Sequence, residues 1–347
     1  MYKLILTVDY EIWGNGTGSF SELVYEPTQK MLEVCDSYNA KLTIFAEMGH
    51  YWAMKRYVNF FKNEISLFEK QLKDAVDRGH DVQMHLHPQW IDATYNKGKW
   101  NLNYNKWACS ELTYNEIYEL LKNGKNDLEN LINQVKKDYR CIAFRAGSWC
   151  ALPSKNLVKA LIKNGFLIDS SVAKGRVLKS DVCNIDYTNA KSAYIPWRIN
   201  PDNINLSNFD GKLMEFPIFS TRRFFPLRFF DNNIINLTKK IKNIKRDSSN
   251  GPIFYDKKKN FLSLILRKIR GDYYQNDFCT ITSNILLRNL LKLKVHTEKC
   301  IPIVLISHSK NFIDLDNFDH FISSVSDFPN FNFSTFYESY NLINKNY

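Results

Sequence analysis

The sequence predicts an α/β fold, either an α/β barrel or a doubly wound sheet. Two observations lead to this prediction. Short apolar runs alternate with helical stretches through most of the 347 residues, and polar or titratable residues follow several of the apolar runs. In both folds the functional groups gather at the carboxyl ends of the strands. The hydrophobic content of 44% allows one large core or two smaller ones.

The first part of the chain predicts two strands with a helix between them, followed by a second helix. Residues 3–9 (KLILTVD) and 41–46 (KLTIFA) are expected to be buried strands, and residues 27–38 are expected to be the helix that joins them. Residues 64–78 have the apolar spacing of a helix and lead through Gly79 into a third strand.

The third predicted strand ends in a histidine-rich stretch, residues 79–90 (GHDVQMHLHPQW). Residues two apart in extended backbone point the same way, so His85 and His87 are expected to share a face. Pro88 ends the strand. Two imidazoles at this place suit a divalent metal if a carboxylate from elsewhere joins them. The alternative is a strand end with purely structural histidines.

The next predicted element is a long helix at residues 113–136. Thr113 is a candidate N-cap, and Glu116 is its capping-box partner three residues on. The further predicted elements are an apolar run at 141–144, a helix at 154–164 that ends before Gly165, strands at 212–219 (KLMEFPIF) and 301–307 (IPIVLIS), and a last strand and helix in the tail.

The seven cysteines are scattered, odd in number and without a CxxC pair, which argues against a disulfide scaffold or a zinc ribbon and favours a reducing compartment. The first residues, MYKLILTVDYEIW, indicate a strand and not a signal peptide. No run is long and apolar enough to span a bilayer. The expected location is therefore cytoplasmic.

The net charge of +11 is concentrated in one segment. Residues 221–300 hold 18 Lys and Arg against 6 Asp and Glu, a balance of +12, whereas the remainder has a balance of −1. Residues 222–230 interleave arginine with phenylalanine, and residues 234–246 and 261–270 have basic amphipathic patterns. This composition is typical of an element facing an anionic membrane. A solvated helix is the alternative, and nucleic-acid binding is less favoured because no recognised module is present.

Five motifs in order resemble the polysaccharide deacetylase superfamily, also called the NodB-homology domain or carbohydrate esterase family 4. They are TVDYE (7–11), GHDVQMHLHP (79–88), FRAGSW (144–149), GFLIDSS (165–171) and VLISHS (304–309). The HxHP and LISHSK segments are most similar to the branch found in bacterial surface-polysaccharide gene clusters. The resemblance implies an incomplete or distorted (β/α)7 barrel as a single domain over residues 1–347, with a basic insertion at about 221–300.

The resemblance also implies an activity, the metal-dependent hydrolysis of N-acetyl or O-acetyl groups on sugars. Asp9 matches the catalytic base, Arg145 the arginine that holds the base, and His308 the general acid. Asp169 matches the carboxylate that orients the acid. The expected substrate-binding residues are Trp149, which would wall the pocket, and Trp90.

Each of these roles has a plainer alternative. Asp9 and Glu11 could form a charged strand end, Arg145 a surface ion pair, and Trp149 part of the core. The sequence DSS around Asp169 could be a turn or cap signal.

The sequence departs from the family at two places. Most members carry Asp-Asp where this chain has Asp9-Tyr10-Glu11, so Glu11 would supply the ligand carboxylate. The usual second histidine lies four residues after the first, and Gln89 stands there. Either His87 is the ligand, or Gln89 offers a weak carbonyl oxygen, or the metal site is degraded.

The predicted site is therefore a divalent ion, expected to be Zn²⁺, held by Glu11, His85 and His87, with Gln89 at most a secondary contact. His50 and His80 are expected to be structural. The expected substrate is a lipid-linked or nucleotide-linked sugar of a surface glycan, modified on the cytoplasmic side of the membrane. The alternatives are a sugar-binding protein that has lost the metal, and a protein that interacts with a membrane surface or nucleic acid.

Overall fold

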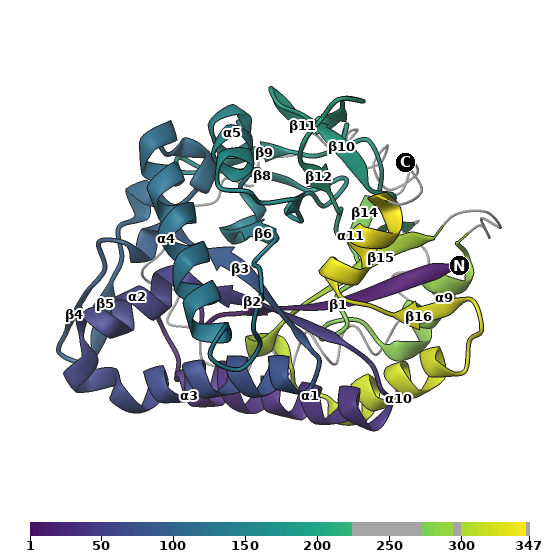
Figure 1. Ribbon diagram of the computed structural model, residues 1–347, viewed down its shortest axis with the longest axis horizontal. Coiled ribbons are helices and arrows are strands. Elements are labelled where there is room, and N and C mark those ends of the chain that lie inside the picture. The colour runs from purple at the N-terminus through teal and green to yellow at the C-terminus, as the bar shows by residue number, and fades with distance from the viewer. Residues whose placement is uncertain (224–271, 294–299, 345–347) are drawn as a thin grey trace, which may run out of the picture.

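The computed structural model describes residues 1–223, 272–293 and 300–344, and its central element is a curved sheet of ten strands (Figure 1). Seven strands pair in parallel in the order of the chain. They are β1 (Tyr2–Tyr10), β2 (Leu42–Glu47), β3 (Asp81–Leu86), β6 (Ala143–Ala146), β7 (Ile168–Asp169), β12 (Met214–Glu215) and β15 (Ile301–His308), and β15 pairs with β1.

The sheet curls back on itself just after β12. Ile218 forms a parallel bridge with Val304 of β15, and the backbone N–H of Phe219 donates to the carbonyl of Val304 over 2.8 Å. β7 and β12 have two residues each, so the barrel is distorted on this side. The predicted distorted (β/α)7 barrel is confirmed.

Helices connect most of these strands and lie around the outside of the curved sheet (Figure 1). They are α1 (Glu26–Ser37), α2 (Met48–Arg56), α3 (Val58–Asp77), α4 (Tyr114–Ile132), α5 (Lys155–Lys163), α9 (Ser283–Leu291), α10 (Leu315–Ser326) and α11 (Phe336–Asn344). None of the helices in the described part of the chain combines the length and the apolar character that a membrane span requires.

The remaining elements are short. The additional strands are β4 (Thr94–Asn96), β5 (Lys99–Asn101), β8 (Val177–Lys179), β9 (Asn184–Asp186), β10 (Trp197–Asn200), β11 (Asn203–Ser207), β13 (Ser220–Arg223), β14 (Asp272–Gln275) and β16 (Phe331–Phe333). The single helical turns are η1 (Ser21–Tyr25), η2 (Pro88–Trp90), η3 (Tyr104–Lys106), η4 (Cys109–Glu111), η5 (Gly147–Trp149) and η6 (Ser309–Asn311).

Local sequence signals explain several element boundaries. At the start of α4, Thr113 Oγ1 accepts from the Glu116 N–H over 3.3 Å, and Glu116 Oε2 accepts from the Thr113 N–H over 3.0 Å, so the predicted capping box is present. The strand predicted at 212–219 is shorter than expected. Pro217 interrupts it, because a proline has no N–H to donate to a ladder.

Side chains of β1 alternate between two buried clusters. Leu4, Leu6 and Val8 pack against the surrounding helices. Ile5 instead lies in a cluster with residues of the opposite strands, and this cluster fills the barrel interior; its other members include Phe45, Ile168, Met214, Phe216, Val304 and Phe336. Between this apolar layer and the carboxyl ends of the strands, the side chains inside the barrel are polar.

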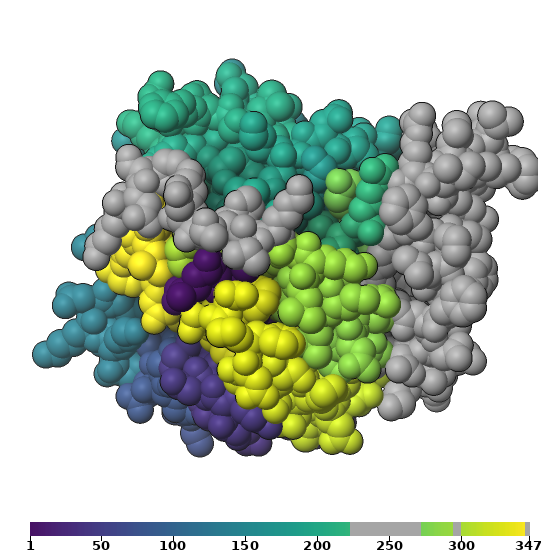
Figure 2. All heavy atoms as spheres, turned by 90° about the vertical axis from the view of Figure 1, so that its right-hand side faces the viewer, coloured from purple at the N-terminus to yellow at the C-terminus, as the bar shows by residue number. Residues whose placement is uncertain are grey.

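The start of β1 and the strand β16 lie side by side at the amino end of the barrel. β16 pairs in parallel with β1, and the rings of Tyr2 and Phe331 stack with centroids 5.4 Å apart. Figure 2 shows the N-terminal residues, in purple, lying among the C-terminal residues, in yellow. The ring of Phe336 at the start of α11 meets the ring of Phe45 edge-on, with centroids 5.5 Å apart. Helix α11 therefore covers the apolar layer on the side away from the carboxyl ends of the strands.

A single disulfide joins Cys150 and Cys183, a pair that the sequence analysis, which argued against a disulfide scaffold, did not predict. Spacing could not reveal this pair, because the connectivity of cysteines cannot be deduced from sequence alone. The basic patterns at 234–246 and 261–270, and residues 224–230, lie outside the described residues.

Candidate active site

A buried charge pair at the site joins β1 to β6. Arg145 Nη1 lies 2.6 Å from Asp9 Oδ1 and 3.0 Å from Thr7 Oγ1, and its Nε donates to the carbonyl of Ser170 over 2.9 Å. The exposed fractions of Arg145 and Asp9 are 0% and 1%. The ring of Phe45 lies 4.0 Å from the guanidinium carbon. The predicted partnership of Arg145 and Asp9 is thus present, and it is buried.

Arg145 and the neighbouring histidines determine the protonation of Asp9. Burial by itself would raise the pKa of this carboxyl, but Arg145 first, then His85 and His308, outweigh burial and hold the pKa below its ordinary value. Asp9 is therefore ionised at neutral pH, as a general base must be.

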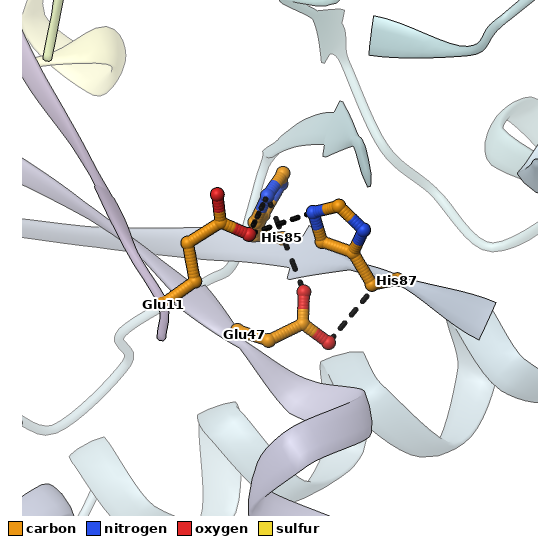
Figure 3. A group of neighbouring side chains, drawn as sticks. All are labelled: Glu11, Glu47, His85 and His87. Atoms are coloured by element: carbon orange, nitrogen blue, oxygen red, sulfur yellow. Dashed lines mark hydrogen bonds and ion pairs between the residues drawn. The ribbon is translucent and has the colours of Figure 1, made fainter. Parts of the chain in front are cut away.

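Four side chains from three neighbouring strand ends converge beside this pair (Figure 3). Glu11 follows β1 and Glu47 ends β2, whereas His85 lies near the end of β3 and His87 directly follows it. The potential ligand atoms of these four side chains all lie within 4.8 Å of one another. Glu11 Oε2 lies 3.3 Å from His85 Nε2 and 2.6 Å from His87 Nε2. All four are buried.

The chemistry of this cluster fits a divalent metal ion. His85 Nδ1 lies 2.9 Å from the carbonyl of Arg145, which can only accept, so Nδ1 carries a proton and Nε2 is the ring nitrogen that can bind an ion after losing its own proton. Glu11 Oε2 faces both imidazole Nε2 atoms, and among the described residues the buried Glu47 Oε2 has no hydrogen-bond donor. Burial would lower the pKa of His85, but the carboxylates of Asp9, Glu11 and Glu47 raise it to about 9. This concentration of negative charge favours a bound cation.

Glu47 is a member of the cluster that the sequence analysis missed. Its signal was its place at the carboxyl end of the strand KLTIFAE, the same place that the other members occupy. Gln89, in contrast, lies behind His87. Its Nε2 is 3.1 Å from His87 Nδ1 and 3.5 Å from the carbonyl of Gly14.

His308 ends β15 and faces Asp9. Its Nε2 lies 3.5 Å from Asp9 Oδ2, and its side chain is 19% exposed. Asp277, which follows β14, presents Oδ2 at 3.7 Å from His308 Nδ1. The structure therefore corrects the expected partner of His308: the facing carboxylate is Asp277 and not Asp169.

Asp169 has other neighbours. Its carboxylate accepts from the Ser171 N–H over 2.9 Å and from Ser171 Oγ over 3.0 Å, and it lies beside the carboxyl of Glu215. Burial raises the pKa of both carboxyls, and the pair holds the backbone after β7, where Val172 N donates to Glu215 over 3.0 Å. Asp169 thus stabilises the backbone that follows β7 next to the site.

The two predicted substrate-binding tryptophans have different environments. Trp149 is half-buried, and its ring centroid lies 6.2 Å from that of His308, so it borders the site as predicted. Trp90 is 2% exposed and packs on the ring of His50 at 4.4 Å. Trp90 therefore lies in the core, and its assignment as a substrate-binding residue stays a prediction.

Lys310 is a further residue that the sequence analysis missed. Its Nζ lies 2.6 Å from Glu11 Oε1 and donates to the carbonyl of Ile12 over 3.2 Å. It follows His308 by two residues in the LISHSK segment. Lys310 and His87 together hold the pKa of Glu11 well below its ordinary value, against the opposing effect of burial.

Fold and site together define a distorted (β/α) barrel with a buried carboxylate and imidazole cluster at the carboxyl ends of its strands. Comparison with solved structures shows that this fold is the one found in polysaccharide deacetylases. A protein from Mycobacterium smegmatis and one from Pseudomonas aeruginosa PAO1, both assigned as polysaccharide deacetylases, are each similar with 12% identity, a TM-score of 0.50, and coverage of 99% of this chain and 91% of theirs.

The same fold also occurs in a larger enzyme. A 4-alpha-glucanotransferase from Thermococcus litoralis is similar with 10% identity and a TM-score of 0.50, and the match covers 98% of this chain but 40% of that protein. No protein-family model and no curated protein matches the sequence. The fold alone therefore leaves the reaction open, and the side chains of the site must decide it.

Proposed function

We propose that the protein is a divalent-metal-dependent hydrolase that removes an acetyl or another small acyl group from a sugar. The observation that carries this proposal is the buried set of Glu11, Glu47, His85 and His87 directly beside the Asp9–Arg145 pair and His308. Hydrolysis of an amide or ester needs a polarised carbonyl, an activated water and a proton donor for the leaving group. This site has a candidate for each need.

The residues take distinct roles in this scheme. A divalent ion held by the cluster would polarise the acyl oxygen and lower the pKa of water. Asp9, held ionised by Arg145, accepts the proton of the attacking water. His308, which faces Asp9 on one side and Asp277 on the other, gives a proton to the leaving nitrogen or oxygen of the sugar. Trp149 provides an aromatic wall next to His308.

Acetate release from acetylated saccharides tests this proposal. We expect Asp9→Asn and His308→Gln each to reduce kcat by at least about 100-fold, the lower end of the range for general acid–base catalysis. His320→Gln is the matched control, because His320 is an exposed histidine of α10. Full activity of the Asp9 and His308 variants would refute the assigned roles. Saccharide binding without hydrolysis by the metal-loaded wild type would instead favour the sugar-binding alternative.

We also propose a setting for the reaction. The substrate would be a precursor of a bacterial surface glycan that carries phosphate through a lipid or nucleotide link, and the metal would be Zn²⁺, which imidazole and carboxylate ligands suit. The enzyme would act on the cytoplasmic side of the membrane. The support is the +12 balance of residues 221–300, which would attract phosphate or anionic lipid.

A further inference from the structure

We propose that Glu47 is the fourth protein ligand of the metal, in place of a histidine at the position of Gln89, and that Gln89 instead fixes the proton of His87. This inference rests on the metal dependence proposed above and is independent of the sugar and of the acyl group. It assigns a ligand set of Glu11, Glu47, His85 and His87.

The side chain of Glu47 is held in position for this role. Its Oε1 accepts from three backbone N–H groups: Gly49 at 2.8 Å, His87 at 3.1 Å and His50 at 3.4 Å. These bonds cap α2 and tie it to the end of β3. The other oxygen, Oε2, is buried, has no hydrogen-bond partner in the described part of the chain and lies 4.0 Å from His85 Nε2. One oxygen therefore anchors the carboxylate, and the second is aimed into the cluster (Figure 3).

Gly49 makes this arrangement possible. A Cβ at this position would lie 2.8 Å from Glu47 Oε1 and 2.8 Å from the carbonyl of His87, closer than side chains approach. Any larger residue would push the carboxylate of Glu47 away from the backbone donors that hold it.

Gln89 is on the wrong side of His87 to join the same ion. His87 directs Nε2 toward Glu11, 2.6 Å away, whereas Gln89 contacts Nδ1, the other ring nitrogen. The ring cannot turn freely, because it packs against Gly147, where a Cβ would come within 2.5 Å of its Cγ and Nδ1. A group hydrogen-bonded to Nδ1 acts on the metal through the imidazole.

The amide of Gln89 suits that indirect role. An imidazole that binds a metal through Nε2 carries its proton on Nδ1 and needs an acceptor there. Gln89 Oε1 is buried and finds no hydrogen-bond donor among residues 1–223, 272–293 and 300–344. A half-turn of the amide would exchange it with the Nε2 atom that lies 3.1 Å from His87 Nδ1. The amide oxygen would then accept from the ring N–H and fix the ring in its ligand form.

Titration of the purified chain with Zn²⁺ or Co²⁺ alone tests the assignment without any sugar. In Glu47→Gln the amide oxygen can still cap α2, which leaves NH₂ facing the cluster, so we expect the affinity to fall by more than about 100-fold and the visible Co²⁺ spectrum to change. Gln89→Ala should weaken binding by about 10- to 100-fold, the range for a group that acts through a ligand, with an unchanged Co²⁺ spectrum. Glu116→Gln is the matched control, since Glu116 caps α4 outside the cluster.

The opposite pattern would overturn the proposal: unchanged Zn²⁺ affinity and Co²⁺ spectrum in Glu47→Gln, with an altered spectrum in Gln89→Ala. If Glu47→Gln does not fold, a crystal structure of the wild-type Zn²⁺ complex decides the question. An ion bound by Glu47 Oε2 together with Glu11, His85 and His87 supports the proposal, and an ion bound without Glu47 contradicts it. Metal binding by this set without acetate release would refute the proposed function alone, whereas acetate release with normal Zn²⁺ affinity in Glu47→Gln would refute this inference alone.

Discussion

Replacement of Arg145 by methionine removes the charge that Asp9 faces and keeps most of the side-chain volume. Both groups are buried, at 0% and 1% exposure, and their atoms are 2.6 Å apart, so the substitution leaves an uncompensated carboxylate inside the barrel. Breaking such a buried pair costs about 3–5 kcal/mol. We expect the free energy of unfolding at pH 7 to fall by this amount. The double variant Arg145→Met/Asp9→Asn should recover part of the lost free energy of unfolding.

The dependence on pH identifies the cause. In the wild type the pKa of Asp9 is lowered, so its contribution to stability is present above the ordinary carboxyl pKa and is lost as pH falls through the folded value. Without Arg145, burial raises the pKa of Asp9 in the folded protein above its value in the unfolded chain. The free energy of unfolding of Arg145→Met should therefore fall as pH rises above about 4. Urea denaturation from pH 5 to 8, with a chelator present throughout, measures the difference. A deficit that is equal at every pH and unaffected by Asp9→Asn would refute this reasoning.

Three further predictions address other parts of the account. His80 accepts at Nδ1 from the Leu42 N–H, and burial lowers its pKa to about 4. Because the unfolded chain binds a proton at this histidine at higher pH than the folded chain does, the free energy of unfolding should fall by up to about 3 kcal/mol as pH drops from about 6.5 to 4. His80→Asn should abolish this pH dependence in acid unfolding curves. Asp277→Asn should lower kcat of acetate release about 10-fold or more with little change in Zn²⁺ affinity; equal kcat would show that His308 needs no carboxylate partner. Sedimentation with anionic liposomes should be lost when Lys239, Lys240, Lys242 and Lys245 are replaced by glutamate, and equal sedimentation of both proteins would remove the membrane hypothesis.

The sequence predicted those parts of the site that depend on periodicity within one strand. Residues two apart share a face, so Asp9 with Glu11 and His85 with His87 could be paired before the structure was known. Parallel pairing then brings these strand ends to one edge of the barrel. The structure has all four residues there, in contact with Arg145 or with one another.

The residues that the sequence analysis missed depend on contacts between distant segments. Glu47 is a single glutamate at a strand end, with no second polar residue two positions away to mark it. Asp277 follows the short antiparallel strand β14, whose sequence carries no periodic pattern, and it reaches His308 only through the tertiary fold. Asp169 was assigned by its place in a motif; its contact with Ser171 is the local turn that DSS can also signal, whereas its contact with Glu215 depends on the tertiary fold.

Removal and restoration of the metal tests the central claim most directly. The purified wild-type protein would be analysed for bound divalent ions, assayed for acetate release from acetylated saccharides, stripped with a chelator, and assayed again after one equivalent of Zn²⁺ is added. We expect about one ion per chain, loss of acetate release on stripping and recovery on addition of Zn²⁺. Acetate release that persists in the stripped protein, or a wild type that neither binds a divalent ion nor releases acetate, would contradict a metal-dependent hydrolase built on Glu11, His85 and His87.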